Sequence, residues 1–340
     1  KPNLFNLDFI IILEVINLQE FDVITFGSSV IDTFVHTDVS EKKNFIYYPV
    51  GSKILITDLR FDIGGGGTNT AVAFARLGLK TGCITKIGDD ENGLNILKLL
   101  RKENVKYLGS MDKDLMTGYS VILDSKGGER TILTYKGANN DLDYNELNFG
   151  NIKTKWLYYS ALLDKSFETQ KKLALKLRKK GTKIAYNPSS YLINEENILP
   201  LLKISDILIV NKEEAIMICE RFKKNKQDIF KSIYSLGPKI VLITNKDETA
   251  VCFDGKKKYS IVPHKNINVV ERTGAGDAFA STFTSAIALG RSLFDALLWS
   301  PINSMSVVQQ IGAQKGLLTQ EEILKYLAKA PAEYKPTKII

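Results

Sequence analysis

The sequence predicts an α/β protein with a doubly wound, mainly parallel sheet that is flanked by helices on both faces. From Phe21 onward, short β-rich runs alternate with helical patterns, as in a series of βαβ units. After Gly274 the pattern is helical almost to the end. No internal repeat and no linker rich in Pro, Gly and Ser divides the 340 residues. We therefore expect one large domain.

The regular elements follow one another in a simple order. The stretch "FDVITFG" (21–27) predicts the first buried strand, and "TNTAVAFARLG" (68–78) predicts a helix that ends in glycine. The stretch "TGCITKIG" (81–88) predicts the next strand. Four later runs of similar composition predict further strands of the same sheet, at 155–160, 183–188, 206–211 and 239–244.

Two stretches interrupt this alternation. Residues 29–63 contain β-rich runs without a clear helix, and residues 117–136 have the pattern of a hairpin around Lys126, Gly127 and Gly128. Strands inserted in this way could form a small separate sheet. Such a sheet could be a flap over an active site or a plain edge hairpin, and the residues alone leave both interpretations open.

The first twenty residues include an apolar run at 9–13, which is too short to span a bilayer and is followed by Glu14. Neither a basic start nor a small-residue cleavage site accompanies it. We expect an extension of unknown role at 1–20, the main domain at 21–330, a C-terminal tail at 331–340 and no membrane partner.

The net charge of +8 and the pI of about 9.1 raise the question of nucleic-acid binding. The lysines are scattered, however, and one basic cluster at 176–180 closes a helical pattern just before Gly181. A second cluster at 256–258 follows the turn signal Asp254-Gly255. Solvated helix ends and turns explain both clusters, so we expect no nucleic-acid partner.

The three cysteines, Cys83, Cys219 and Cys252, lie far apart in apolar stretches, and the chain has only two histidines. Their spacing fits neither a zinc site nor a disulfide framework. We expect buried, reduced thiols and a cytoplasmic location.

The stretch "ERTGAGDAFAS" (271–281) carries the strongest chemical signal. Gly274, Ala275 and Gly276 allow close approach of the backbone, and a helix that begins there would direct free N–H groups at an anion. Asp277 lies in the first turn of that helix. It is either a residue that stabilises the helix start or a reactive group beside a bound anion.

Two further polar motifs precede predicted helices. The run "GGGGTN" (64–69) does not match a dinucleotide fingerprint and is either a flexible turn or a close contact, with Asn69, to a polyhydroxyl ligand. In "NKEE" (211–214), Asn211 and Glu214 have the spacing of a capping box. The same pair could face hydrated magnesium and phosphate oxygens.

Taken together and in this order, the motifs resemble those of the ribokinase-like (PfkB) family of carbohydrate and nucleoside kinases. The resemblance extends from about Phe21 to Leu327. The stretch "GGGGTNTAVAFARLG" resembles the first family signature, "GDDENG" the element that follows it, and "ERTGAGDAFAS" the second signature. The shorter matches "NPS" (187–189), "NKEE" and "IGAQKG" (311–316) fall in the order of the family.

The resemblance implies ATP-dependent, Mg²⁺-assisted phosphoryl transfer to a hydroxyl of a small sugar or sugar-like acceptor. Asp277 would be the general base, and the N–H groups of Gly274, Ala275 and Gly276 would hold charge on the phosphoryl group. The inserted strands within about 29–63 and 117–136 would be the lid of the family, which excludes water.

The resemblance also implies roles for residues outside the second signature. The acceptor hydroxyls would be held by Asp32, Gly65, Gly66 and Asn69. The nucleotide would be bound near Asn187, Asn211, Thr244 and Lys246. Asn211 and Glu214 would organise Mg²⁺ through water, and Glu271 marks the place of a monovalent cation such as K⁺.

Gly66 and Val30 stand where ribokinases carry lysine and asparagine, which leaves room for another sugar, a sugar phosphate or a nucleoside as acceptor. A non-catalytic binding protein that retains the fold is the alternative from another class, and the intact Asp277 argues against it. We also expect a homodimer that forms through the lid strands.

Overall fold

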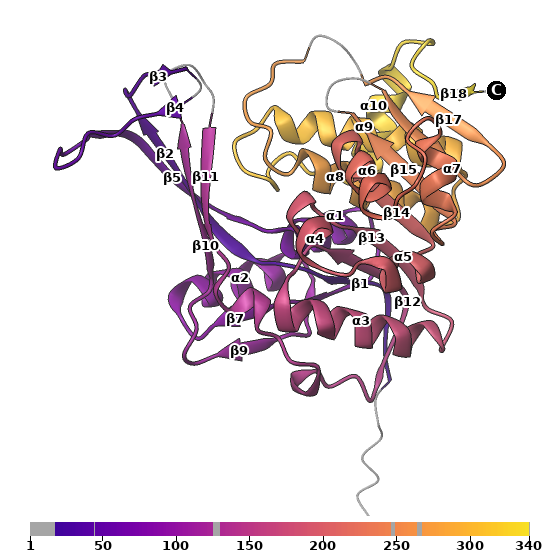
Figure 1. Ribbon diagram of the computed structural model, residues 1–340, viewed down its shortest axis with the longest axis horizontal. Coiled ribbons are helices and arrows are strands. Elements are labelled where there is room, and N and C mark those ends of the chain that lie inside the picture. The colour runs from indigo at the N-terminus through magenta and orange to yellow at the C-terminus, as the bar shows by residue number, and fades with distance from the viewer. Residues whose placement is uncertain (1–17, 44, 125–129, 246–248, 264–266, 340) are drawn as a thin grey trace, which may run out of the picture.

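The computed structural model describes residues 18–43, 45–124, 130–245, 249–263 and 267–339 (Figure 1). A ten-stranded sheet forms the centre of the protein. From one edge to the other its strands are β18 (Thr337–Ile339), β17 (Lys258–Ile261), β16 (Ala250–Phe253), β15 (Ile240–Thr244), β14 (Ile207–Asn211), β13 (Lys183–Asn187), β12 (Ile152–Ser160), β1 (Gln19–Phe26), β6 (Thr81–Ile84) and β8 (Lys106–Tyr107). Neighbouring strands from β8 to β15 are parallel to one another. Strands β16, β17 and β18, at the other edge, are each antiparallel to their neighbours.

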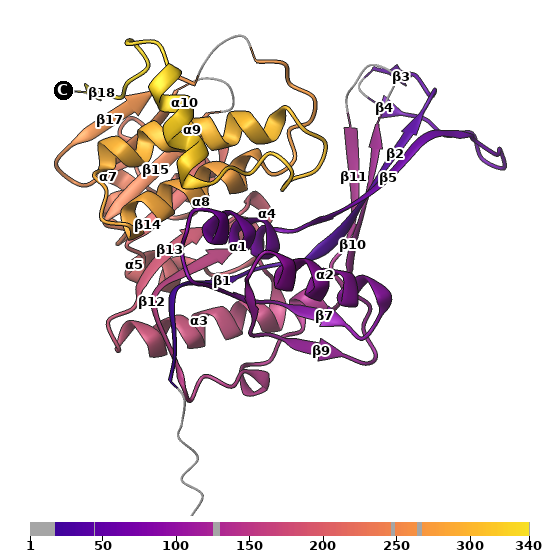
Figure 2. The ribbon, with the colours of Figure 1, turned by 180° about the vertical axis from the view of Figure 1, so that it is seen from behind.

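Helices cover both faces of this sheet (Figures 1 and 2). One face carries α3 (Asp164–Arg178), α4 (Ser190–Glu195), α5 (Leu199–Ile204), α6 (Lys212–Arg221) and α7 (Ile229–Tyr234). The other face carries α1 (Gly66–Arg76), α8 (Ala275–Ala288), α9 (Leu293–Val308) and α10 (Gln320–Lys329). Along β12, Leu157 and Tyr159 pack in the first core, whereas Trp156 and Tyr158 pack in the second. A strand that is buried on both faces explains the unbroken apolar run in its sequence.

A second, four-stranded sheet stands beside the main sheet and is called the lid here (Figure 1). Its order is β11 (Arg130–Tyr135), β10 (Gly118–Asp124), β2 (Val30–Thr37) and β5 (Ile56–Gly64). The two central strands are parallel, and each outer strand is antiparallel to its neighbour. The predicted separate sheet is therefore confirmed. The hairpin residues 125–129 lie outside the described residues.

The remaining elements are short. Helix α2 (Glu91–Lys102) contributes Ile96 and Leu100 to a third apolar cluster with Ile31 of the lid. Two pairs of short strands form their own small sheets: β3 (Glu41–Lys42) with β4 (Phe45–Ile46), and β7 (Lys86–Gly88) with β9 (Ser110–Asp112). Two 3₁₀ turns, η1 (Gly137–Asn140) and η2 (Tyr144–Glu146), precede β12.

The predicted α/β class, the doubly wound sheet and the helical C-terminal region are confirmed. Two details differ from the sequence prediction. The stretch 81–88 is not one strand, because β7 leaves the main sheet and pairs with β9. Residues 337–339, which we assigned to a tail, form β18 and extend the edge of the main sheet.

The three cysteines are buried thiols, as expected. In the described part of the chain, no helix combines the length and the apolar character that crossing a bilayer requires.

Candidate active site

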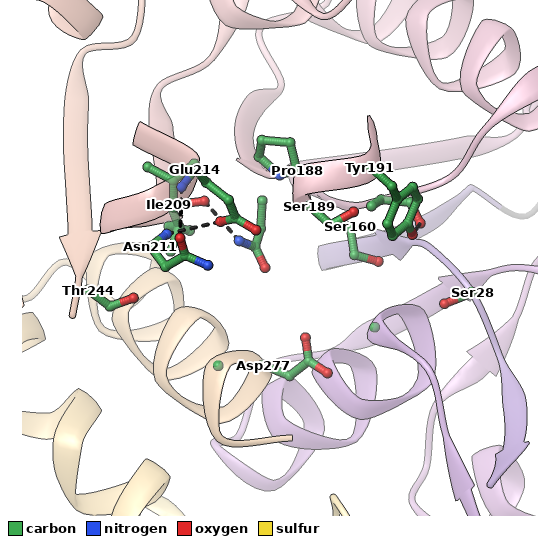
Figure 3. Close-up of a pocket in the computed structure, with 15 residues that line it drawn as sticks. Ser28, Ser160, Pro188, Ser189, Tyr191, Ile209, Asn211, Glu214, Thr244 and Asp277 are labelled. Carbon is green, nitrogen blue, oxygen red and sulfur yellow. Dashed lines mark hydrogen bonds between the residues drawn. The ribbon is translucent and has the colours of Figure 1, made fainter. Parts of the chain in front are cut away.

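A cleft of about 280 Å³ lies at the carboxyl ends of the central strands (Figure 3). It brings together many of the residues that the sequence singled out: Gly66, Asn187, Asn211, Glu214, Thr244, Gly276 and Asp277. Open parallel sheets bind ligands at this edge, because the loops and helix starts that follow the strands converge there.

The start of α8 forms one side of the cleft. Gly274 precedes the helix with φ of +81°, and a Cβ atom there would lie 2.5 Å from the Cβ of Ala313, so only glycine fits. A Cβ on Gly276 would meet nothing within 4 Å. The first helical turn therefore presents its backbone to open space, and its N–H groups and dipole favour an anion.

The carboxylate of Asp277 points into the cleft from this turn (Figure 3). Its Oδ2 accepts a hydrogen bond from Nδ2 of Asn69 at 2.9 Å. Desolvation raises the pKa of Asp277, and the hydrogen bond from Asn69 opposes this shift. A carboxylate with a raised pKa is a stronger base, which suits the removal of a proton from an alcohol.

The start of α1 lies opposite and is densely packed. Gly65 has φ of +93°, and its added Cβ would lie 2.4 Å from the carbonyl oxygen of Ser28. A Cβ on Gly67 would lie 2.6 Å from the backbone of Gly27. These glycines are thus required by close backbone contacts, and the interpretation as a merely flexible turn does not hold.

Asp32 belongs to the lid and is not among the residues that line the cleft. It lies on β2, directly opposite Asp62 of β5 and in register with Ser120 of β10. Burial raises the pKa of Asp32 to about 6; the hydrogen bond from Ser120 opposes this, and the charges of Asp62 and Asp277 add to it. A Cβ on Gly64 would lie 2.0 Å from Oδ2 of Asp32, so glycine is needed to hold this carboxyl group.

Asn211 and Glu214 form the predicted capping box at the start of α6. Oδ1 of Asn211 accepts from the N–H of Glu214 at 2.8 Å, and Oε2 of Glu214 accepts from the N–H of Asn211 at 3.0 Å. Both residues also line the cleft, so the two interpretations of this motif are compatible. Burial raises the pKa of Glu214, and the backbone N–H groups of Asn211 and Ser190 oppose the shift.

Asn187 and Thr244 complete this side of the cleft. Asn187 ends β13 and donates from Nδ2 to the carbonyl oxygen of Ile209 at 2.8 Å. Thr244 ends β15 in register with Asn211 of β14. Lys246, the fourth residue expected near the nucleotide, lies outside the described residues.

Glu271 is not among the residues that line the cleft. It forms an ion pair with Arg130 at the start of β11 and accepts the N–H of Thr273 at 2.9 Å. Arg130 also donates to Oγ1 of Thr273 at 2.9 Å. The lid is thereby tied to the loop that leads into α8.

Residues 23–320 match the model of the pfkB family of carbohydrate kinases. The chain belongs to this family. It is therefore a carbohydrate kinase of the PfkB type, and the expected family and enzyme class are confirmed.

Relatives of this PfkB-family kinase include a ribokinase of Dictyostelium discoideum, which is 29% identical over 78% of this chain and 87% of its own length. A 5-dehydro-2-deoxygluconokinase of Clostridium perfringens is 28% identical over 93% of this chain and 95% of its own length. A putative ribokinase II of E. coli, solved in complex with ATP and Mg²⁺, superimposes with a TM-score of 0.77. It is 16% identical and covers 91% of this chain and 99% of its own, which shows a shared fold.

Gln314 and Arg130 are among the residues around this PfkB-family site that were not assigned a role from the sequence, as are Ser28, Ser160 and Tyr191 of its lining. Gln314 donates to Oδ1 of Asn69 at 3.0 Å, yet it was noted only as part of "IGAQKG". Arg130 follows the hairpin glycines and was not singled out. Both act through contacts between segments more than a hundred residues apart, and such contacts leave no local pattern.

Proposed function

We propose that this protein transfers the γ-phosphoryl group of ATP, with Mg²⁺, to a hydroxyl of a small neutral sugar, and that Asp277 is the general base. The observation that carries the proposal is the position of Asp277. Its carboxylate enters the cleft from the first turn of α8, beside the open backbone of Gly276. A proton acceptor beside an anion site is the arrangement that transfer to an alcohol needs.

On the nucleotide side, the N–H groups of Gly274 and Gly276 stabilise charge on the transferring phosphoryl group. The N–H of Ala275, which we also expected to take part, donates to the carbonyl oxygen of Arg272 at 3.3 Å. Asn211 and Thr244 lie across the cleft from this turn (Figure 3), and Asn187 also lines the cleft. All three would contact the phosphates. Such transfer depends mainly on positioning and charge stabilisation, which fixed backbone donors supply without reorganisation.

Asn211 and Glu214 are the residues that fit Mg²⁺. Oxygen ligands suit this ion, and both side chains are fixed at the cleft by the capping box. Within the described ranges, no three His, Cys, Asp or Glu side chains gather to hold a metal ion directly. The ion would therefore keep several of its water ligands and bind to phosphate oxygens as well. When bound, it would offset the negative charge of the phosphates.

On the acceptor side, Asp32, Gly65, Gly66 and Asn69 hold the hydroxyl groups of the sugar. Asp32 on the lid is oriented by Ser120, and Gly66, which lines the cleft, presents its backbone to the ligand. The ion pair between Arg130 and Glu271 keeps the lid over the loop before α8, which excludes water from the reaction. A monovalent cation such as K⁺ would have to share the Glu271 carboxylate with Arg130, which already pairs with it.

The lid also favours a homodimer. Its edge strands, the loop before β5 and the neighbouring strand β4 expose large apolar side chains, among them Phe61 and Leu133, Leu55, and Phe45. An exposed apolar face of this kind is suited to cover the same face of a second copy. Light scattering at micromolar concentration should report twice the mass of the chain, and a monomer there would contradict the proposal.

An ADP-release assay tests the proposed reaction. The purified chain is incubated with MgATP and, in turn, D-ribose, D-fructose, adenosine, D-fructose 6-phosphate and 5-dehydro-2-deoxygluconate. We expect turnover with a neutral sugar, and K⁺ in place of Na⁺ should raise it. Release no faster than without acceptor, for every compound, would favour a non-catalytic binding protein. Turnover with adenosine alone would make the protein a nucleoside kinase.

A further inference from the structure

A buried chain of amide groups leads from the loop after α9 to the carboxylate of Asp277. Gln314 and Asn69 are 5% and 4% exposed. Nε2 of Gln314 donates to Oδ1 of Asn69 at 3.0 Å, and Nδ2 of Asn69 donates to Oδ2 of Asp277 at 2.9 Å. Asn69 is thus held between two partners, one on each side of its amide.

We propose that Gln314 is a positioning residue, which sets the orientation of the Asn69 amide so that its NH₂ group faces Asp277. This inference rests on the proposed function, because Asp277 matters here as the base of the reaction. Gln314 acts through Asn69 and does not itself touch the reacting groups.

The direction of the hydrogen bonds supports this role. A side-chain amide has one end that donates and one that accepts, and the two ends are nearly the same size, so its orientation is decided by its partners. Nε2 of Gln314 also donates to the carbonyl oxygen of Ile63 at 3.0 Å. A carbonyl oxygen can only accept, so Ile63 fixes the NH₂ end of Gln314. That NH₂ group in turn fixes the oxygen of Asn69 on its own side.

Without Gln314, none of the residues that the structure describes would distinguish the two ends of the Asn69 amide on that side. An inverted Asn69 would present its oxygen to the carboxylate of Asp277, and two acceptors would then face each other. The preferred orientation supplies a hydrogen bond to the charged form of Asp277, which is the form that takes a proton.

The loop that carries Gln314 is itself anchored. Nη1 of Arg76 donates to the carbonyl oxygens of Gln314 and Leu317, at 2.8 and 2.9 Å. The same guanidinium group binds Glu103 in a bidentate ion pair, with 2.8 and 3.0 Å between donor and acceptor atoms. A planar group held in this way keeps the backbone at 314 fixed, so the side chain of Gln314 is presented at a constant position.

The charged and titratable groups around Asp277 define the expected pH effect. Asp32 on the lid and the hydroxyl of Tyr158 interact with its charge, and Asn69 supplies the hydrogen bond. That hydrogen bond lowers the pKa of Asp277. If the hydrogen bond from Asn69 is lost, the pKa of Asp277 rises further. The acidic limb of the pH profile of kcat then moves to higher pH. A purely structural defect would lower the plateau and leave the limb in place.

The test is a double-mutant cycle between Gln314→Met and Asn69→Ala, with kcat measured from pH 5 to 9 on the best neutral sugar. Methionine matches the length of glutamine and removes both hydrogen bonds. We expect Gln314→Met to lower kcat about 10- to 100-fold, the factor that corresponds to a lost hydrogen bond to a charged group. The acidic limb should move to higher pH. In the Asn69→Ala background the same change should alter kcat less than about twofold.

Gln309→Met is the matched control. Gln309 lies five positions earlier, and its Nε2 donates only within its own helix end, to the carbonyl oxygen of Met305 at 2.9 Å. It should keep the wild-type kcat and pH profile. Equal losses from Gln314→Met in both backgrounds, or a loss with an unmoved acidic limb, would overturn the positioning role. A wild-type protein inactive on every acceptor would instead overturn the proposed function, and this inference with it.

Discussion

Two helices of this kinase begin at glycine-rich turns on opposite sides of one cleft, and they use glycine for different reasons. At the start of α1, added Cβ atoms on Gly64, Gly65 and Gly67 would collide with Asp32, Ser28 and Gly27. At the start of α8, a Cβ on Gly276 would enter open space. At Gly64, Gly65 and Gly67 the space beside the backbone is filled by the protein itself, whereas at Gly276 it is open.

The contrast shows that a run of glycines does not by itself mark a ligand site. The N–H of Gly67 is already used by the carbonyl oxygen of Ser28, at 2.8 Å. The turn at Gly276, in contrast, has an acid beside it that faces the cleft, Asp277. What separates the two turns is the space next to the backbone, and each of the following changes tests that difference.

We call the start of α8 at Gly276 the open turn and the start of α1 at Gly64 to Gly67 the closed turn. Removing Asp277, the acid at the open turn, should have the largest effect on activity. Asp277→Asn keeps the shape of the side chain and its contact region but abolishes the base, so kcat should fall about 10²- to 10⁴-fold. Binding of MgADP should stay within about twofold of wild type, as measured by titration calorimetry. A variant with wild-type kcat would show that Asp277 only stabilises the helix start.

Adding a methyl group at the closed turn should lower the stability of the fold and should not act directly on phosphoryl transfer. Gly67→Ala would place a methyl group 2.6 Å from the backbone of Gly27, which cannot move aside like a side chain. We expect a loss of about 3 kcal/mol in the free energy of unfolding, measured by urea denaturation. Gly150→Ala, where the nearest atom lies 3.7 Å from the added Cβ, should change stability little. Equal stability of the two variants would contradict the close packing of α1.

The carboxyl group packed against the closed turn should respond to pH. Asp32 has its pKa raised to about 6, from an ordinary value of 3.8, so the folded state keeps a proton that the unfolded state has released between these values. Wild-type stability therefore falls as the pH rises from about 4 to 6. Asp32→Asn should be more stable than wild type at pH 8 by at most about 3 kcal/mol and equal to it at pH 4. Urea denaturation at both pH values measures this, and a constant difference would disprove the raised pKa.

Adding a methyl group at the open turn should have the smallest effect. It should raise the free energy of unfolding but lower kcat/KM for ATP. Gly276→Ala adds a good helix former at an exposed position, so the free energy of unfolding should rise by up to about 1 kcal/mol. The methyl group enters the space where phosphate would lie, and kcat/KM for ATP should fall several-fold. Unchanged ATP kinetics would mean that the phosphates lie elsewhere.

The sequence predicted the fold where one segment carries its own pattern. The apolar run at 156–160 is buried on both faces, and the spacing of Asn211 and Glu214 produced the capping box. The secondary-structure prediction was wrong for two segments whose sheet is decided by pairing with a strand that is distant in the sequence. The stretch 81–88 looks continuous, but pairing with β9 draws β7 into a different sheet. Strand β18 consists of three exposed residues without any apolar pattern, and only the free edge of β17 makes it a strand.

The grouping of residues at the cleft, though not their proposed roles, was predictable to the same extent. Asp277 and its glycines form one local motif, so they could be assigned together. The hydrogen bond between Gln314 and Asn69 joins residues 245 positions apart, and nothing in either neighbourhood indicates it. The contact of Arg130 with Glu271 spans 141 positions and escaped notice for the same reason.

The lid is assembled from two stretches of chain that are far apart, since β2 ends at Thr37 and its parallel neighbour β10 begins at Gly118. On the ribosome, β2 and β5 would emerge as a two-stranded ribbon, which is marginally stable at best in water. They acquire their central partner only after α1, β6 and α2 have been made, and closing so long a loop is entropically costly. The apolar residues of this ribbon therefore stay uncovered in newly made chains until β10 has been made, and during this interval they are exposed to aggregation.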